Sequence, residues 1–330
     1  MNKIIYKIVI IITLLVLILS FINKQIENFS NTNPIFPIDI VYTWAGEKFN
    51  NDIRLSNNNE LKYSLRSVFK YTPWVNHIFI LMNPPKKIPS WFNDKYKEKI
   101  TLVDHYETFN RKNLPNTNSN AIESTIVNIP GLSEHFIYLN DDFFFGNYVN
   151  YQNFFSKDGK LIIDQERVKN CSSMQMENKD KAVNLELPIY CGEGRHIPIP
   201  HKKSILKSFT DKYNEYLEWI RNIKSRKDRG IEFCLKHNLK EWCQQQHNLV
   251  AKFAYDNHQA ITKYFSDDEA IFIWNHDNNK KILNDIKTRH PMFFCINDKT
   301  FKTDEEKIKV FKEIRDFFEE FYSEKPFYEI

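Results

Sequence analysis

The sequence predicts an α/β fold, in which a Rossmann-like, mostly parallel sheet is followed by a helix-rich carboxyl-terminal part. Between residues 38 and 140, apolar runs alternate with amphipathic stretches in the order strand, helix, strand, strand, helix, strand, a pattern typical of parallel sheets. The apolar runs are rich in β-branched and aromatic residues, as buried strands are. With 330 residues, 42% of them hydrophobic, the chain is long enough for one large domain or two modest ones.

The first half of the chain supplies the predicted sheet. We expect strands at 38–42, 77–82, 100–103 and 135–139, and helices at 60–70 and 121–128. The first of these helices places Leu61, Leu65 and Val68 on one face. Thr72-Pro73 ends it, because the residue before a proline avoids the helical conformation.

The second half predicts mainly helices, at 203–223 and 240–265, while the segment 147–194 follows no regular pattern. An apolar run at 293–296 precedes a closing helix. That helix starts at a capping box formed by Thr303 and Glu306. Its apolar stripe is expected to lie in the core and consists of Ile308, Phe311, Ile314, Phe318 and Phe321.

The first 22 residues predict a signal-anchor helix, with a cleaved signal peptide as the alternative. Residues 8–22 carry no charge, and no small-residue cleavage motif follows them. Lys3 and Lys7 precede the run, so the positive-inside rule keeps the amino terminus in the cytoplasm. A polar stem at 23–37 comes next. We therefore expect a single-pass type II membrane protein whose bulk is lumenal, as in the Golgi or endoplasmic reticulum, or extracytoplasmic.

The cysteines and sequons agree with a lumenal location. The five cysteines contain no CxxC pair, which argues against a zinc knuckle; they are Cys171, Cys191, Cys234, Cys243 and Cys295. An oxidising lumen allows up to two disulfides with one thiol left over, in a connectivity that the sequence leaves open. Asn28 and Asn170 each begin a glycosylation sequon.

The composition excludes several classes of protein. Only 7 glycines are present, and neither GxGxxG nor GxxxxGK[ST] occurs, so dinucleotide-fold and P-loop fingerprints are missing. The net charge of +4 is spread along the chain, which argues against a nucleic-acid partner. A local site for phosphate anions is the better expectation.

The strongest candidate for chemistry is Asn140-Asp141-Asp142, which directly follows the buried run at 135–139. The carboxyl ends of parallel strands are where open α/β sheets bind ligands. Adjacent carboxylates and an amide offer hard oxygen ligands for Mg²⁺ or Mn²⁺, completed by substrate phosphates. A solvated polar turn is the alternative, but Phe143-Phe144-Phe145 follows at once, and three aromatic residues are unusual beside a surface turn.

Further polar residues complete an inventory for phosphoryl transfer. His196 opens the segment that ends at His201, and Asn297-Asp298 ends another apolar run. A histidine can move a proton, and arginines can hold phosphate oxygens; the candidates are Arg54, Arg66 and Arg229. If one bound phosphosugar serves both groups, His196 must lie within about 10 Å of the Asp141 and Asp142 carboxylates.

These motifs resemble the Stealth family of sugar-1-phosphate transferases. Four blocks carry the resemblance, at 38–44, at 60–146 with gaps, at 196–198, and from 295 through the closing helix. After Tyr-Thr-Trp, however, Ala45-Gly46 replaces the family's usual Val-(Asp/Asn)-Gly. The arginine of the third block corresponds to Arg226 or Arg229 by spacing, or to Gln246 in another alignment.

The resemblance implies a glycosyltransferase-A-like catalytic domain over 38–330, with a nucleotide-sugar part at 38–165 and a helix-rich part at 166–330. It implies His196, Asp298 and Arg229 as catalytic residues and Asp141 and Asp142 as ligands of Mg²⁺ or Mn²⁺. The substrate-binding residues it implies are Thr43, Trp44, Arg54, Arg66, Asn83, Ser119, Glu123, Asn140 and Asn297.

The implied reaction transfers a sugar-1-phosphate, such as an N-acetylhexosamine- or hexose-1-phosphate, from a UDP-sugar to a hydroxyl of a glycan or glycoprotein and releases UMP. His196 or Asp298 would accept the hydroxyl proton. The alternatives are a glycosyltransferase that releases UDP and an inactive binding homologue, which the departures from the family pattern motivate. An oligomer is compatible with the sequence.

Overall fold

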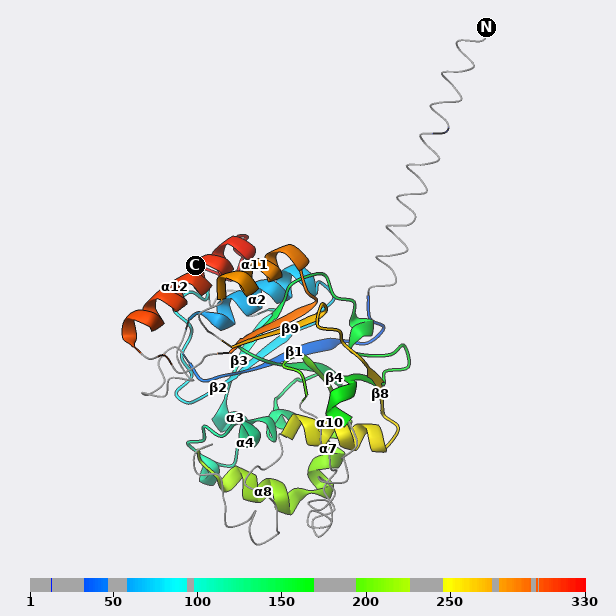
Figure 1. The fold of residues 1–330 in the computed structure, drawn as a ribbon. Helices are drawn as coiled ribbons and strands as arrows, with labels where there is room; N and C mark the ends of the chain where they lie inside the picture. Colours follow the sequence, from blue (N-terminus) through cyan, green and yellow to red (C-terminus); the bar gives the residue numbers. More distant parts are fainter. Residues whose placement is uncertain are drawn as a thin grey trace, which may run out of the picture.

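A five-stranded sheet lies at the centre of the molecule (Figure 1). Its spatial order is β3-β2-β1-β4-β7, and its strands are β1 (Ile38–Trp44), β2 (Ile78–Met82), β3 (Ile100–Asp104), β4 (His135–Asn140) and β7 (Ile199–Lys202). The first four are parallel, and β7 is an antiparallel edge strand. The structure is a computed structural model that describes Thr13 and residues 33–46, 58–93, 98–168, 194–225, 246–274, 279–297, 301 and 303–330.

Helices cover both faces of this sheet (Figure 1). The α12 layer consists of α2 (Glu60–Tyr71), α11 (Asn279–Arg289) and α12 (Asp304–Phe321). The α10 layer, on the other face, consists of α3 (His105–Thr108), α4 (Ser119–Glu123), α7 (Lys203–Lys212), α8 (Asn214–Asn222) and α10 (Gln246–Asp256). Short 3-10 turns occur at η3 (Arg111–Asn113), η4 (Ile126–Asn128), η5 (Tyr151–Asn153) and η6 (Gln165–Val168).

Two smaller sheets join early and late parts of the chain. One has the order β5-β10-β9 and is built from β5 (Phe143–Phe145), β10 (Phe293–Asn297) and β9 (Ala270–Trp274). The other pairs β6 (Leu161–Asp164) with β8 (Ala260–Lys263). With β7 in the central sheet, these pairings interleave residues from both sides of position 165. The parts expected at 38–165 and 166–330 are therefore joined through shared sheets.

The structure confirms the α/β class, the parallel strands and both early helices. The second of these helices is interrupted. The stretch predicted as a helix at 121–128 is divided between α4 and η4, and the one at 203–223 between α7 and α8. The prediction of a helix at 240–265 was wrong at its carboxyl end, because α10 stops at Asp256 and residues 260–263 form β8. His258, with φ at 57°, turns the chain between them.

The sequence did not predict β7. Its Pro200 pairs in register with Ile137 of β4, and proline lacks the N–H that a central strand needs. An edge strand tolerates it, which reconciles the prolines near His196 with a place in the sheet.

The closing helix α12 begins as predicted, with the Thr303 side chain accepting a hydrogen bond from the Glu306 N–H at 3.2 Å. Phe311, Ile314 and Phe318 are buried. Ile308 was expected in the core but is 67% exposed, because the buried face runs through Val310 and Phe317 instead.

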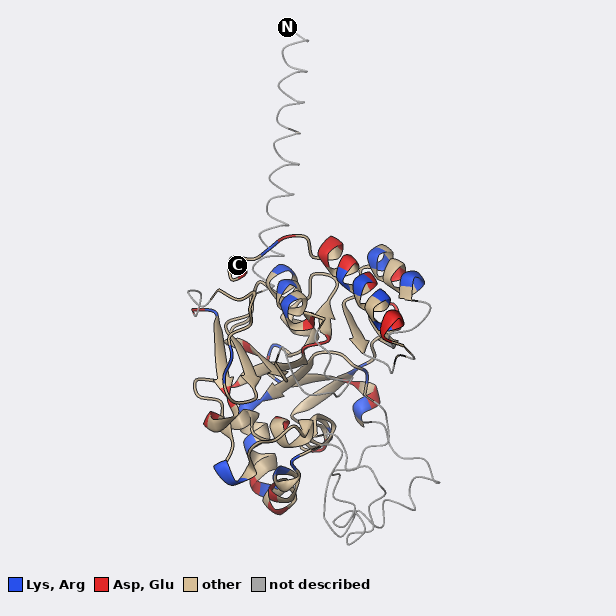
Figure 2. Ribbon diagram, turned by 90° about the vertical axis from the view of Figure 1, so that its left-hand side faces the viewer, with Lys and Arg blue, Asp and Glu red and all other residues tan. Residues whose placement is uncertain are grey.

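Charged residues lie mostly on the outer helices, and the strands are largely free of them (Figure 2). Within the described ranges, no helix has both the length and the hydropathy needed to cross a bilayer. The anchor prediction (apart from Thr13), the stem up to residue 32, both sequons and four of the five cysteines lie outside the described residues. Cys295 is buried and carries a free thiol.

Candidate active site

Polar residues gather at the carboxyl edge of the central sheet, where the parallel strands end. Thr43 of β1 pairs in register with Asn140 of β4. On the other side of β1, Trp44 pairs with Met82, the last residue of β2, so that Asn83 follows at the same edge. Predicted residues from three segments far apart in the sequence are thus neighbours, as expected of parallel strands.

The Asn140-Asp141-Asp142 turn also contacts the end of β10. The Ile296 N–H donates to the Asp142 carbonyl at 3.3 Å, and the Cys295 thiol donates to Asp142 Oδ2 at 3.4 Å. Asn297 is the last residue of β10 and directly follows the two residues that contact Asp142. Asp298 follows it and lies outside the described residues.

His196, in the bend before β7, packs against the same small sheet. Its Nδ1 is 3.9 Å from Cys295 Sγ, and its ring packs 4.5 Å from the Phe272 ring, centroid to centroid. Since each Cys295 contact is shorter than 4 Å, His196 Nδ1 and Asp142 Oδ2 lie within about 8 Å of each other. This separation meets the geometric condition for a shared site, about 10 Å.

The carboxylates dominate the electrostatics of this edge. Burial, with the Asp142 and Asp141 charges nearby, raises the pKa of the Cys295 thiol well above its usual value. Burial and the Asp141 charge likewise act to raise the pKa of Tyr42. Neighbouring groups are therefore kept neutral, and the net negative charge of the turn favours a cation.

The donor set of the turn fits a hard divalent cation. Asp141, Asp142 and Asn297 offer carboxylate and amide oxygens, which Mg²⁺ and Mn²⁺ prefer. Within the described ranges, no group of three or more His, Cys, Asp or Glu side chains is arranged to hold a metal. One or two carboxylates completed by substrate phosphates is the usual arrangement for Mg²⁺, and this turn can provide the protein's share.

A second group of polar side chains lies beneath the same edge, against the α10 layer. The Tyr138 hydroxyl is 3.0 Å from Thr43 Oγ1, 2.7 Å from Asn140 Oδ1 and 3.3 Å from Glu123 Oε1. Glu123 Oε2 also accepts the His247 N–H at 3.2 Å and lies 2.9 Å from His247 Nδ1. Thr43, Glu123 and Asn140 of the predicted substrate-binding set therefore meet at one hydroxyl.

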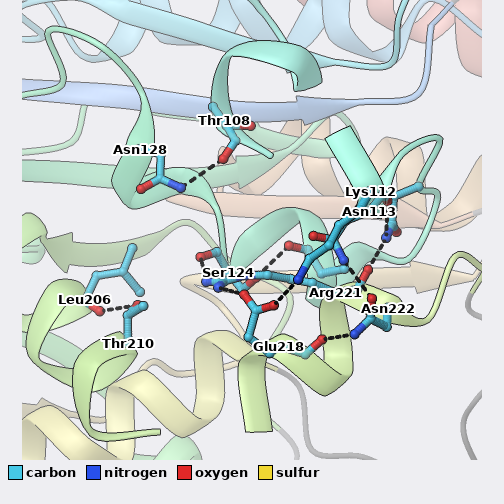
Figure 3. Close-up of polar contacts among 12 residues, drawn as sticks. Thr108, Lys112, Asn113, Ser124, Asn128, Leu206, Thr210, Glu218, Arg221 and Asn222 are labelled. Atoms are coloured by element: carbon cyan, nitrogen blue, oxygen red, sulfur yellow. Dashed lines mark hydrogen bonds and ion pairs between the residues drawn. The ribbon is translucent and has the colours of Figure 1, made fainter. Parts of the chain in front are cut away.

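A brace of polar contacts holds α4, and with it Glu123, in place (Figure 3). Arg221 of α8 donates to the Ser124 carbonyl at 3.0 Å and to its hydroxyl at 2.9 Å. Glu218 pairs with both Arg221 and Lys112 at 3.2 Å. The carboxyl end of α4 is consequently tied to α8 through charge-assisted hydrogen bonds.

Arg66 was predicted to bind substrate, and the structure corrects this. Its guanidinium is 1% exposed and forms a bidentate pair with Glu329 at 2.5 and 2.7 Å. It also donates to Glu319 at 3.2 Å and to the Tyr322 carbonyl at 2.6 Å. These partners occupy its hydrogen-bonding groups inside the α12 layer, so Arg66 has the contacts of a structural residue.

The remaining predicted residues have simpler outcomes. Ser119 starts α4 and Asn83 follows β2, both half-buried, whereas Trp44 is buried. Arg54 and Arg229, like Arg226, lie outside the described residues. Gln246, the alternative to the third-block arginine, begins α10 and is buried, and its N–H donates to Asn120 Oδ1 at 3.3 Å.

Sequence reasoning missed three residues of the site: Tyr138, His247 and Cys295. Tyr138 and Cys295 stand inside apolar runs, so both had the appearance of core residues. His247 directly follows Gln246, and only its pairing with Glu123, 124 positions earlier, sets it apart.

Comparison with known proteins gives a consistent result. The family model described as Stealth protein CR2, conserved region 2, matches residues 54–163. The capsular polysaccharide phosphotransferase LcbA of Neisseria meningitidis is 28% identical over 309 residues, covering 80% of this chain and 78% of the relative. The capsular polysaccharide phosphotransferase cps12A of Actinobacillus pleuropneumoniae is 33% identical over 268 residues, which cover 74% of this chain and 66% of the relative.

Solved structures are more distant. The galactosyltransferase LgtC, in complex with donor and acceptor sugar analogs, aligns with a TM-score of 0.43 and 8% identity over 84% of this chain and 95% of that one. The apo-form glycosyltransferase GlyE of Streptococcus pneumoniae TIGR4 aligns with a TM-score of 0.40 and 10% identity. The alignment covers 87% of this chain and 63% of that one. At these scores, the similarity is a remote likeness of fold.

Proposed function

The chain belongs to the Stealth family, and from this premise we propose that it transfers a sugar-1-phosphate from a UDP-sugar to a hydroxyl of a glycan acceptor, releasing UMP. Relatives named as phosphotransferases support sugar-phosphate transfer in general. The UDP-sugar donor and the leaving UMP are the finer part of the proposal.

One observation carries the proposal: Asp141, Asp142, His196 and Asn297 converge at the carboxyl edge of the sheet. Cys295 contacts both Asp142 and His196, and the end of β10 is hydrogen-bonded to the Asp142 backbone. A pair of carboxylates and a histidine within reach of one bound phosphosugar is the arrangement that metal-assisted phosphoryl transfer needs.

In the proposed reaction, Asp141 and Asp142 would hold Mg²⁺ or Mn²⁺. When bound, the metal would neutralise charge on the phosphoryl oxygens of the donor. The acceptor hydroxyl attacks the phosphorus nearer the donor sugar and gives its proton to His196. The bond from that phosphorus to the bridging oxygen breaks, and UMP leaves with that oxygen.

The chain's amides and hydroxyls complete the site in this proposal. Asn140, Asn297 and Thr43 orient the phosphates and sugar hydroxyls at the strand ends. Replacing His196 with alanine is expected to lower kcat by about 10²–10⁴-fold, the usual contribution of a general base, while donor binding measured by calorimetry is retained.

The test is a screen of nucleotide-sugars with Mg²⁺ or Mn²⁺ and a glycan acceptor, in which the released nucleotide is identified. We expect UMP together with a phosphodiester-linked product. Release of UDP would instead assign glycosyl transfer. An absence of metal-dependent turnover with every donor would contradict both and favour a binding role.

We further propose that residues 1–22 anchor the protein, with its bulk lumenal or extracytoplasmic. The support is the charge-free run at 8–22 behind Lys3 and Lys7. Protease treatment of intact vesicles is expected to spare the domain from residue 38 onward. Digestion of the domain without detergent would reverse the assignment.

A further inference from the structure

The proposed reaction leaves Tyr138 and His247 without a role, although both belong to the polar group beneath the carboxyl edge. Tyr138 is 1% exposed, and a buried hydroxyl is normally hydrogen-bonded. Here it lies within hydrogen-bonding distance of three side chains, from β1, α4 and the metal-binding turn. One hydroxyl thus links β1, α4 and the end of β4.

The hydrogen bonds of this hydroxyl can be assigned by counting protons. A tyrosine hydroxyl has one proton to donate and two lone pairs to accept. The 2.7 Å contact to Asn140 Oδ1 is the shortest of the three, so the proton is directed there. Thr43, at 3.0 Å, then donates its own proton to the Tyr138 oxygen.

Glu123 competes less well for that proton, because its Oε1 is 3.3 Å from the Tyr138 hydroxyl, against 2.7 Å for Asn140 Oδ1. Two N–H groups of His247 converge on Glu123 Oε2, and the Tyr138 hydroxyl is 3.3 Å from the other oxygen. The His247 ring also stacks on the Tyr138 ring, with centroids 6.2 Å apart. The Glu123–His247 pair therefore holds the Tyr138 ring in place.

The state of the hydroxyl agrees with this assignment. Burial and the Glu123 carboxylate raise the pKa of Tyr138 well above its usual value, so the group remains a donor throughout the physiological range. With Asn140 Oδ1 held by Tyr138, the amide nitrogen Nδ2 faces away from Tyr138. Its two N–H groups then become available to an anionic group at the edge.

We propose that Tyr138 is a positioning residue that orients the Asn140 amide, so that its N–H groups donate to a phosphate oxygen of the substrate. This inference rests on the proposed function and assigns to Asn140 a ligand class, the phosphoryl oxygens. Glu123 and His247 act one step further away, by holding Tyr138 in place.

A double-mutant cycle tests the proposal. Asn140→Ala is expected to lower kcat/KM about 10²-fold, as loss of a phosphate donor does, and Asn140→Asp by at least as much, because it keeps the shape and removes the N–H groups. Tyr138→Phe is expected to lower kcat/KM about 10-fold, as loss of a supporting hydrogen bond does. In the Asn140→Ala background, Tyr138→Phe should have almost no further effect on kcat/KM.

Tyr322→Phe is the matched control. It also removes one buried tyrosine hydroxyl, which donates to the Phe145 carbonyl at 2.7 Å, at the end of β5 away from the turn. It is expected to lower the melting temperature about as much as Tyr138→Phe does and to leave kcat/KM unchanged in both backgrounds. A loss of kcat/KM equal to that of Tyr138→Phe would mean that general loosening, not positioning, causes the effect.

The outcomes separate this proposal from the proposed function. If the wild-type protein turns over and the Tyr138 and Asn140 effects on kcat/KM add, or if Tyr138→Phe has no effect, only the assignment of Tyr138 is overturned. If the wild type releases no UMP, the proposed function itself fails. Should Tyr138→Phe not fold, His247→Ala removes a group that holds Tyr138 in place and enters the same cycle with the same expected non-additivity.

Discussion

Two buried polar clusters lie on opposite faces of the central sheet, and they differ in where their hydrogen bonds lead. In the α12 layer, Arg66 is paired with Glu329 and Glu319 and bonded to a backbone carbonyl. In the α10 layer, His247 and Glu123 lead through Tyr138 to Asn140. The first cluster is closed by the chain itself, whereas the second ends at the carboxyl edge of the sheet.

This difference shows that burial of a charge does not by itself mark a functional site. Arg66 has the residue type expected of a phosphate ligand, but its hydrogen bonds are made by the protein. Asn140 has an ordinary residue type for a turn, but it stands at the end of a parallel strand, where α/β sheets bind ligands. Position along the strand is therefore the better guide.

The largest effect is expected at the carboxyl edge. Asp141→Asn and Asp142→Asn should each lower kcat/KM about 10³-fold or more, about 4 kcal/mol of transition-state stabilisation, with little change in melting temperature. EDTA should abolish wild-type turnover, and added Mg²⁺ or Mn²⁺ should restore it. Asp158→Asn, in an exposed turn, is the matched control; wild-type rates in both site variants would refute the metal-binding assignment.

The next largest effect is expected in the closed cluster, on stability instead of activity. Arg66→Ala leaves Glu329, whose side chain is 1% exposed, without its main partner, and loss of one member of a buried ion pair costs about 3–5 kcal/mol. Urea unfolding should show this loss, while kcat/KM of the folded fraction is retained.

Lys312→Ala is the control for the closed cluster. It removes an exposed ion pair with Asp316, formed at 2.6 Å, and should change the free energy of unfolding by less than about 1 kcal/mol. If Arg66→Ala lost turnover with unchanged stability, Arg66 would act in the active site after all, and the two clusters would not differ in function.

The smallest effect is expected from His201, which packs on Phe136 beneath the sheet. Burial, with the nearby His247 and Arg167, lowers the pKa of His201 to about 3. Between about pH 6.5 and 3, the unfolded chain therefore binds a proton that the folded protein does not. Stability is full above pH 6.5 and should fall by about 1.4 kcal/mol for each pH unit below it.

His201→Leu should remove that part of the pH dependence in urea titrations between pH 7 and 5. His105 has a pKa lowered to about 4, mainly by burial, and keeps its own contribution in the variant. His258→Asn, at an exposed turn position, should leave the slope unchanged. An unchanged slope in His201→Leu would show that His201 is not held neutral.

The sequence predicted the elements that depend on local patterns. The periodicity of Leu61, Leu65 and Val68 predicted α2, and the apolar run before Asn140 predicted β4 and its place at the ligand-binding edge. The edge strand β7 was missed because Pro198 and Pro200 are typical of loops, and only the neighbouring β4 makes Pro200 compatible with a sheet.

The site was predictable where residue type and strand end coincide, as at Asp141 and Asp142. It was not predictable where function depends on a partner far along the chain. Arg66 and Glu329 are 263 positions apart, and nothing local shows that they meet. Tyr138 likewise has the pattern of a core aromatic residue until Glu123 and Asn140 are placed around its hydroxyl.

The pairing of Arg66 with Glu329 also sets the order in which this protein can mature. At about 5–20 residues per second, a ribosome needs more than about ten seconds to add the 263 positions between them. Until Glu319 and Glu329 have both been added, α2 carries an arginine without its two counter-charges. A nascent chain that stops before Glu329 lacks the main partner of this buried arginine, so prematurely terminated products should be less stable by about 3–5 kcal/mol and cleared more readily by proteases.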